Sequence, residues 1–128
     1  MKTNSVERVI QSQLSAICPR CFQAPADVSA EYPLIAWETS STDISDMSRD
    51  DIFLDISIWF RAGASTQAAA NDIADRIERA LDGANLPQRD ILPTFYRWGD
   101  RRLTIDDDKT LRRIVLRFVV QNYENEVI

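Results

Sequence analysis

Two cysteines stand in the order Cys18-Pro-Arg-Cys21, which has the C-x-x-C spacing of redox dithiols. In such enzymes the first thiol is activated at the N-terminus of a helix that follows a strand. Here the pair follows an expected helix and precedes an irregular stretch, and the sequence contains no histidine to complete a zinc site. We interpret both cysteines as reduced packing residues, and a small thiol redox enzyme that uses them is the alternative.

Three consecutive carboxylates, at Asp106, Asp107 and Asp108, could supply oxygen ligands to a divalent cation. They lack the alternation and the trailing glutamate of a calcium loop. A solvated turn between two strands is therefore the better interpretation.

The segment 94–104 mixes aromatic with basic residues, a composition that can stack on single-stranded nucleic acid. These residues are Phe95, Tyr96, Arg97, Trp98, Arg101 and Arg102. Because the whole chain has 20 acidic and 15 basic residues and a net charge of -5, nucleic acid is not the expected ligand. We predict a protein-facing or solvated strand, interrupted near Gly99.

Composition excludes several classes of protein. Without histidine there is no Ser-His-Asp or Cys-His nucleophile pair, and the three glycines are too scattered for a P-loop or a dinucleotide fingerprint. No apolar run approaches the roughly 20 residues of a membrane helix, and the N-terminus lacks the pattern of a signal peptide. We therefore expect no enzyme activity, no catalytic residue, no cofactor, no metal site and no membrane contact.

The element that must position everything else is a strand followed directly by a long helix, at 51–82. Apolar residues alternate through the strand at Ile52, Leu54, Ile56, Ile58 and Phe60, which is the period of a β-strand. After Gly63, Ser65 is the expected N-cap, and Gly83 is placed to end the helix. One arc of this helix is apolar and the other is charged, so the apolar arc should pack on the apolar strand face.

Around this unit we expect a helix at 4–17, a strand at 32–38, the interrupted strand at 94–104 and a last strand at 111–121, with a short strand at 21–23 as a further candidate. The length suits one domain, 1–128. The predicted fold is α+β, with a mostly antiparallel sheet of about four to five strands, one long helix on one face and an N-terminal helix. Residues 122–128 should form a loose tail.

The second face of the sheet carries most information about function. Its side chains are too apolar for water yet interleaved with charges, as in interfaces between subunits. The candidate interface residues are Phe53, Asp55, Trp59, Arg61, Arg113, Val115, Arg117 and Val119. The alternative is that the N-terminal helix covers this face.

The polar stretch 39–50 should be a long mobile loop, and loops of that length in compact domains are commonly functional. Its candidate partner-contact residues are Ser41, Asp43, Ile44, Asp46, Met47 and Arg49. A monomeric binding module that uses this loop is a second alternative function.

In its order of elements the chain resembles the tail terminator, or tail completion, proteins of long-tailed bacteriophages. The resemblance rests on the strand Tyr32-Pro33-Leu34-Ile35-Ala36-Trp37, the strand-helix unit at 51–82, and the Arg-rich segment with Asp106 to Asp108 before the last strand.

The resemblance implies a structural virion protein that forms a ring, commonly a hexamer, on the head-proximal end of the tail tube. There it would stop tube polymerisation and offer a surface for head joining. The implied partners are other copies of the chain, the tail tube protein and the head-tail connector, with DNA passing through the ring. The implied location is the virion, and the host cytoplasm during assembly.

Overall fold

The computed structural model describes residues 3–23, 32–41, 49–88, 91–106 and 109–124. The elements in chain order are α1 (Thr3–Ile17), β1 (Cys21–Gln23), β2 (Leu34–Ser41), β3 (Arg49–Arg61), α2 (Ala64–Leu81), β4 (Ile91–Arg97), β5 (Arg102–Ile105) and β6 (Leu111–Glu124). The predicted α+β class is confirmed.

One sheet contains all six strands, in the order β1-β2-β3-β6-β4, with β5 also pairing with β6. Only the β1–β2 pair is parallel. The expected strand at 94–104 is divided into β4 and β5, which follow one another along β6, with Arg97 opposite Phe118 and Arg102 opposite Val115. The predicted interruption lies where Gly99 adopts a φ of 87°, a conformation that suits glycine.

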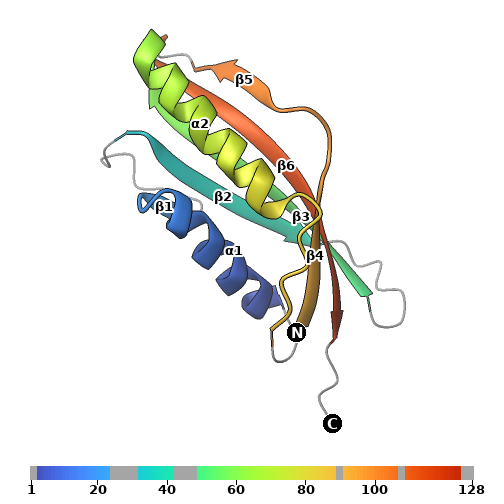
Figure 1. Ribbon diagram of the computed structural model, residues 1–128. Helices are drawn as coiled ribbons and strands as arrows, with labels where there is room; N and C mark the ends of the chain where they lie inside the picture. Colours follow the sequence, from blue (N-terminus) through green and yellow to red (C-terminus); the bar gives the residue numbers. More distant parts are fainter. Residues whose placement is uncertain (1–2, 24–31, 42–48, 89–90, 107–108, 125–128) are drawn as a thin grey trace.

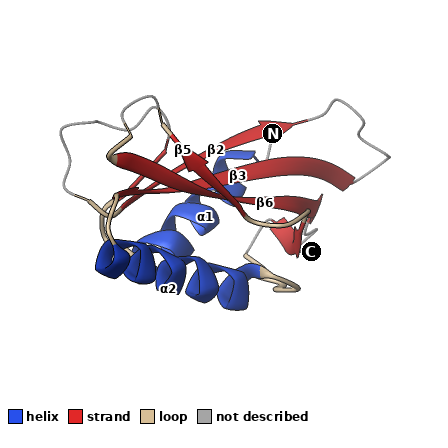
Figure 2. Cartoon of the chain, turned by 90° about the horizontal axis from the view of Figure 1, so that it is seen from above, coloured by secondary structure: helices blue, strands red, loops and turns tan. Residues whose placement is uncertain are grey.

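The helices and the sheet form two layers, with α1 and α2 on the same side of the sheet (Figures 1 and 2). We call this side of the sheet the inner face and the opposite side the outer face. The alternating residues of β3 from Ile52 to Phe60 all lie on the inner face, each at most 1% exposed. They face the apolar side of α2, where Ala70, Ile73, Ala74, Ile77 and Leu81 are buried. The predicted packing of helix on strand is confirmed.

The start of α2 differs from the prediction. Its N-cap is Gly63, whose φ of 155° is rare for residues with a side chain, so the helix begins at Ala64 and Ser65 lies inside the first turn. The Thr66 hydroxyl donates to the carbonyl oxygens of Gly63 and Arg61. At the other end Gly83 has a φ of 75°, and the helix ends there as predicted.

The N-terminal helix α1 buries Val6, Val9, Ile10 and Leu14 in the same core as α2. Its Glu7 carboxylate accepts a hydrogen bond from Thr39, whose neighbours on β2 point the other way. The alternative that this helix covers the outer face is therefore wrong. Two helices share the inner face because the sheet is wide enough to bury both apolar stripes there.

The strands are longer than the sequence pattern indicated. Residues 39–41 belong to β2 and residues 49–50 to β3, so the predicted loop 39–50 is wrong at both ends, and residues 42–48 lie outside the described residues. The predicted loose tail is likewise wrong at its start, because β6 runs to Glu124 and Asn122 is only 1% exposed. These strand ends carry polar residues and no apolar alternation. They are strands because their backbone groups pair with the neighbouring strand, which the sequence pattern does not show.

Candidate interaction surface

The candidate interface residues of β3 and β6 lie together on the outer face. The register places Phe53 opposite Val119, Asp55 opposite Arg117, Ser57 opposite Val115 and Trp59 opposite Arg113. Most of these side chains are half-buried, and Arg117 is exposed. Because directly opposite residues of an antiparallel pair touch, the sequence positions that alternate along two distant strands become one continuous surface.

Charged and aromatic side chains on the outer face pair across the strands. The Arg117 Nε lies 3.4 Å from the Asp55 Oδ1, and both side chains remain about half exposed. The Arg113 guanidinium lies 5.0 Å from the centre of the Trp59 ring, a cation–π distance. These contacts restrain the long side chains before a partner binds, so less conformational entropy is lost when a partner covers them.

Arg61, at the end of β3, belongs to the margin of this surface. Its guanidinium lies 4.8 Å from the centre of the Tyr32 ring and donates to the Thr110 hydroxyl over 3.1 Å. Arg61 is opposite Leu111 in the register. It therefore extends the outer face toward the β2 edge of the sheet.

Two aromatic residues enlarge the surface beyond the prediction. The rings of Trp98 and Phe53 are 4.8 Å apart and tilted by 40°, and Trp98 is 54% exposed. Tyr96 is opposite Val119 and 43% exposed. The sequence indicates that Thr94, Tyr96 and Trp98 share one face, because they alternate along the expected strand 94–104. Only the pairing of β4 with β6 shows that this face adjoins Phe53.

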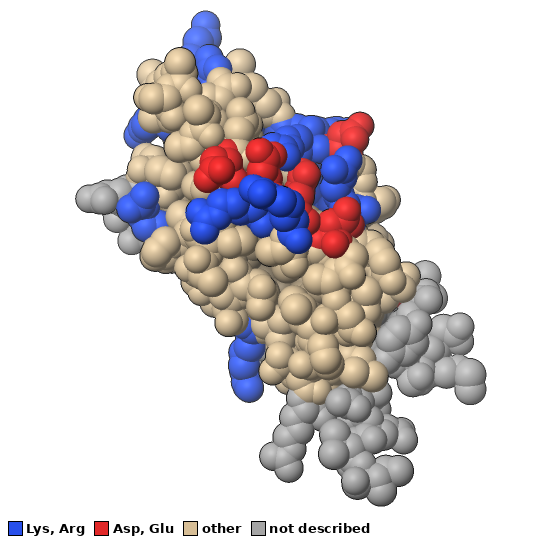
Figure 3. Space-filling model, in the orientation of Figure 1, with Lys and Arg blue, Asp and Glu red and all other residues tan. Residues whose placement is uncertain are grey.

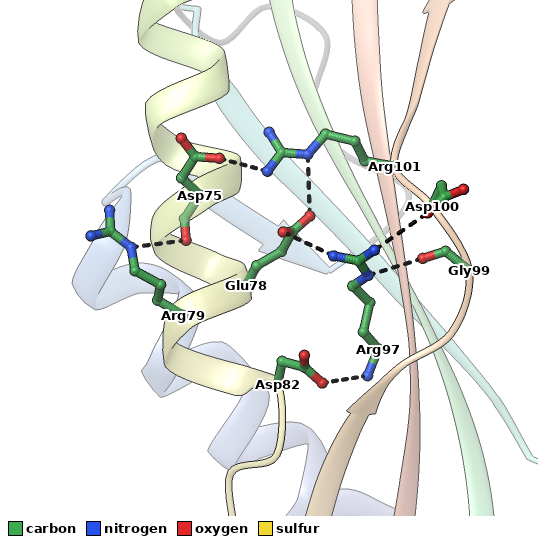
Figure 4. Close-up of polar contacts among 8 residues, drawn as sticks. All are labelled: Asp75, Glu78, Arg79, Asp82, Arg97, Gly99, Asp100 and Arg101. Carbon is green, nitrogen blue, oxygen red and sulfur yellow. Dashed lines mark hydrogen bonds and ion pairs between the residues drawn. The ribbon is translucent and has the colours of Figure 1, made fainter.

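Arg97 and Arg101 of the same segment point to the inner side, toward α2 (Figure 4), whereas Arg102 is opposite Val115 on the outer face. Arg97 lies 3.4 Å from Glu78, and Arg101 contacts Asp75 at 2.5 Å and Glu78 at 3.2 Å. The hydrogen bond with Asp75 raises the pKa of the Arg101 guanidinium. The Asp82 carboxylate also accepts from the Arg97 amide, so the chain between β4 and β5 is fastened to the helix.

The net charge of -5 disfavours binding of single-stranded nucleic acid. Stacking of bases needs aromatic and cationic side chains on one surface. Arg97 and Arg101 lie on the opposite side of the sheet from Trp98, where they pair with Glu78 and Asp75. The outer face keeps Arg102, Arg113 and Arg117 on the same side as Trp98, so it is the net charge that speaks against nucleic acid.

Figure 3 shows the side that carries α2, where acidic and basic side chains gather in one mixed band. The shallow pocket lined by Asp75, Glu78, Arg79 and Asp82 is part of that band. Two of its carboxylates already form ion pairs, Glu78 with Arg97 and Asp75 with Arg101.

The predicted partner-contact loop is only partly described. Ser41 lies in β2 opposite Ile52, and Arg49 lies in β3 opposite Tyr123. Asp43, Ile44, Asp46 and Met47 fall outside the described residues.

The cysteine pair lies in the core, where Cys18 is 4% and Cys21 is 5% exposed. Desolvation by burial, with the neighbouring Cys18, raises the pKa of the Cys21 thiol to about 12. The side chain of Gln11 ties this corner together, because its Oε1 accepts from Trp37 Nε1 over 2.8 Å and its Nε2 donates to the Cys21 carbonyl over 3.1 Å. A nucleophilic thiol requires the opposite shift, so the geometry favours a packing role.

The described residues contain no group of three or more His, Cys, Asp or Glu side chains that could hold a metal ion. Of the three consecutive aspartates only Asp106 is described. No helix among the described residues is long and apolar enough to cross a membrane.

A family model described as Tail completion protein gp17 matches residues 10–120. The chain belongs to this family of phage tail completion proteins. The match includes the strand-helix unit and all the candidate interface residues of β3 and β6. The chain is therefore a structural protein of the phage tail.

Among solved structures, the chain is similar to one chain of the structure titled "Virion of native gene transfer agent (GTA) particle", with 21% sequence identity and a TM-score of 0.61. The similarity covers 88% of this chain and 84% of that chain. At this identity it shows a shared fold. No curated protein matches the sequence.

Proposed function

We propose that this chain forms a ring, a hexamer as the resemblance implies, that caps the head-proximal end of the tail tube, stops tube polymerisation and presents the surface to which the head connector binds. The family membership supports a role in completing the tail. The fold is shared with one chain of the virion of a gene transfer agent particle, which supports a place in a virion.

The observation that carries the ring proposal is the outer face. Phe53, Trp98 and Tyr96 form an aromatic patch beside the Asp55–Arg117 pair, and neither helix covers it. A patch with exposed aromatic and arginine side chains has the composition of interface centres. Such a patch is costly to leave in water, so a partner protein should cover it.

The partner that completes a ring is another copy of the chain. When the outer face of one subunit contacts a different surface of the next, the same contact repeats around an axis and closes if the rotation allows. The contact predicted for the stretch 39–50 would be with the neighbouring subunit or with the tube protein. The excess of acidic over basic residues, 20 to 15, would let DNA slide through the ring without adhering.

Sedimentation of the pure protein, alone and with purified tail tube protein, tests this function. We expect a ring-sized species. The association of its subunits should become tighter with added salt, because salt screens the repulsion between subunits of net charge -5. With tube protein present, the ring should bind tube ends and limit tube length in electron micrographs. A monomer at all concentrations that still binds tube protein would favour the monomeric binding module instead.

A further inference from the structure

The strand β5 has one uncovered edge. It pairs with β6 on one side, and no strand among the described residues pairs with its other side. The neighbouring strand β4 differs, because the segment after α2 covers its outer edge: Phe95 donates to Ala84 and Gly83 donates to Phe95, each over 2.8 Å. Open strand edges are templates for pairing with another chain.

The backbone groups on this open edge can be assigned. Asp106 N donates to Leu111 O over 3.1 Å, so Asp106 directs its backbone groups toward β6. In an antiparallel pair this direction alternates with each residue, so Arg102 and Thr104 also face β6. Leu103 and Ile105 therefore point their N–H and C=O groups away from the sheet.

The side chains of the same two residues are apolar and poorly covered. Leu103 is 48% and Ile105 is 57% exposed, and both lie on the side of the sheet that carries α2. Arg102, Thr104 and Asp106 are exposed on the opposite side. Neither Arg102 nor Asp106 has an ion-pair partner among the described residues.

The sequence Arg102-Leu103-Thr104-Ile105-Asp106 is complementary to itself when read in the antiparallel direction. We propose that β5 is a self-pairing edge, through which two copies of the chain join their sheets around a twofold axis at Thr104. In this register Leu103 lies opposite Ile105 of the second copy, and Arg102 lies opposite Asp106 of the second copy. Apolar pairs then share one side of the joined sheet and opposite charges share the other.

The hydrogen-bond directions select the same register. The outward groups belong to Leu103 and Ile105, and the twofold register makes these two residues a directly opposite, hydrogen-bonded pair. In a register shifted by one residue, backbone groups that point outward from one copy would meet residues whose backbone groups point inward in the second copy. The same shift would place Arg102 opposite Ile105 of the second copy. Both the charges and the backbone therefore point to a second copy rather than to an unrelated peptide.

This contact is separate from the proposed ring contact. A twofold contact is complete with two copies, whereas the ring contact repeats around an axis. The two surfaces are also different, since the ring contact uses the aromatic patch of the outer face. Each can fail without the other.

Hydrogen exchange of the Leu103 and Ile105 amides, resolved to single residues at low and high protein concentration, tests the pairing. Both amides should exchange quickly in dilute protein and become protected as concentration rises. Arg102→Asp or Asp106→Arg alone places like charges opposite each other at both ends, so each should weaken pairing about tenfold. The double variant Arg102→Asp/Asp106→Arg restores both ion pairs and should recover the protection.

Arg76→Asp, an exposed change on α2 with the same change in charge as Arg102→Asp, is the matched control and should leave the protection unchanged. Wild-type amides that exchange equally fast at all concentrations would overturn the proposal. The short length and the charged residues of β5 would then serve to prevent pairing with another chain. Protection that survives both single changes, or that the double variant does not recover, would overturn it as well. Protection of β5 only after tail tube protein is added would identify that protein as the occupant instead.

Discussion

Trp98 lies against Phe53 on the outer face, with ring centres 4.8 Å apart, although Phe53 is in β3 and Trp98 follows β4, a strand that does not pair with β3. The contact spans β6, whose Arg117 carbonyl accepts from the Trp98 amide over 2.8 Å. The aromatic patch therefore depends on three strands of the sheet. Its position fixes where we expect subunits to meet.

The aromatic residues of the patch should matter more for assembly than for folding. Trp98→Ala removes a side chain that is 54% exposed, so the free energy of unfolding should fall by only about 1 kcal/mol. Ring association should weaken by at least about tenfold, since interface energy concentrates in aromatic residues. Trp59→Ala should behave similarly. Urea unfolding measures the effect on stability and sedimentation measures the effect on the ring. Arg76→Ala, at an exposed position of α2, is the control.

Reversal of charge at Arg117 should also weaken the ring more than the fold. Arg117→Glu faces the Asp55 carboxylate, now 3.4 Å from Arg117, with a like charge. The double variant Asp55→Arg/Arg117→Glu restores the pair within the chain and should recover any lost stability. If the ring recovers equally in the double variant, the pair acts only within the subunit. Rings that form normally in Trp59→Ala and Arg117→Glu would place the interface elsewhere.

The inner face should respond as a closely packed core. Leu54 and Phe118 lie directly opposite each other, and both are fully buried. Leu54→Ala or Phe118→Ala should each cost about 2–5 kcal/mol of unfolding free energy, as cavity-forming changes do. Ser57→Ala, on the outer face of the same strand, is the control and should be close to neutral. Unchanged melting of both core variants would contradict the placement of α2.

Gln11 should stabilise the fold through Trp37. Gln11→Leu leaves the Trp37 indole N–H, now bonded over 2.8 Å in a residue that is 1% exposed, without an acceptor. The cost should be about 1–3 kcal/mol. In a double-mutant cycle, Trp37→Phe removes the donor, so Gln11→Leu should cost less in that background. Equal costs in both backgrounds would show that the indole N–H finds another acceptor.

Cys21 should make stability depend on alkaline pH. Its pKa is raised from the ordinary 9.0 to about 12, so the folded chain keeps the proton where the unfolded chain releases it. This contribution is complete below the unfolded value and is lost as pH rises from 9.0 toward about 12. The wild type should lose at most about 1.4 kcal/mol per pH unit more than Cys21→Ala in urea unfolding.

The cysteines should not be needed for assembly. The variant with both Cys18→Ser and Cys21→Ser should form rings and complete tails if it folds. A folded double variant that fails to assemble would show that the thiols have a function beyond packing.

The sequence alone determined the central unit of this protein. Alternation from Ile52 to Phe60 and the helical period of Ile73 and Ile77 predict a strand and a helix that bury their apolar sides together, and the structure has that arrangement. The eight predicted interface positions were also found from alternation, because a period of two assigns every residue of a strand to one face. Their role as an interface remains a proposal.

The tertiary structure decided what lies beside what. Alternation places Trp98 on one face of a strand, but only the pairing of β4 with β6 puts it next to Phe53. It also decided that α1 joins α2 on the inner face and that β6 continues through Asn122, because long-range strand pairing, rather than local pattern, fixes both. Local periodicity specifies an element and its faces, whereas pairing order and register depend on contacts between residues far apart in the chain.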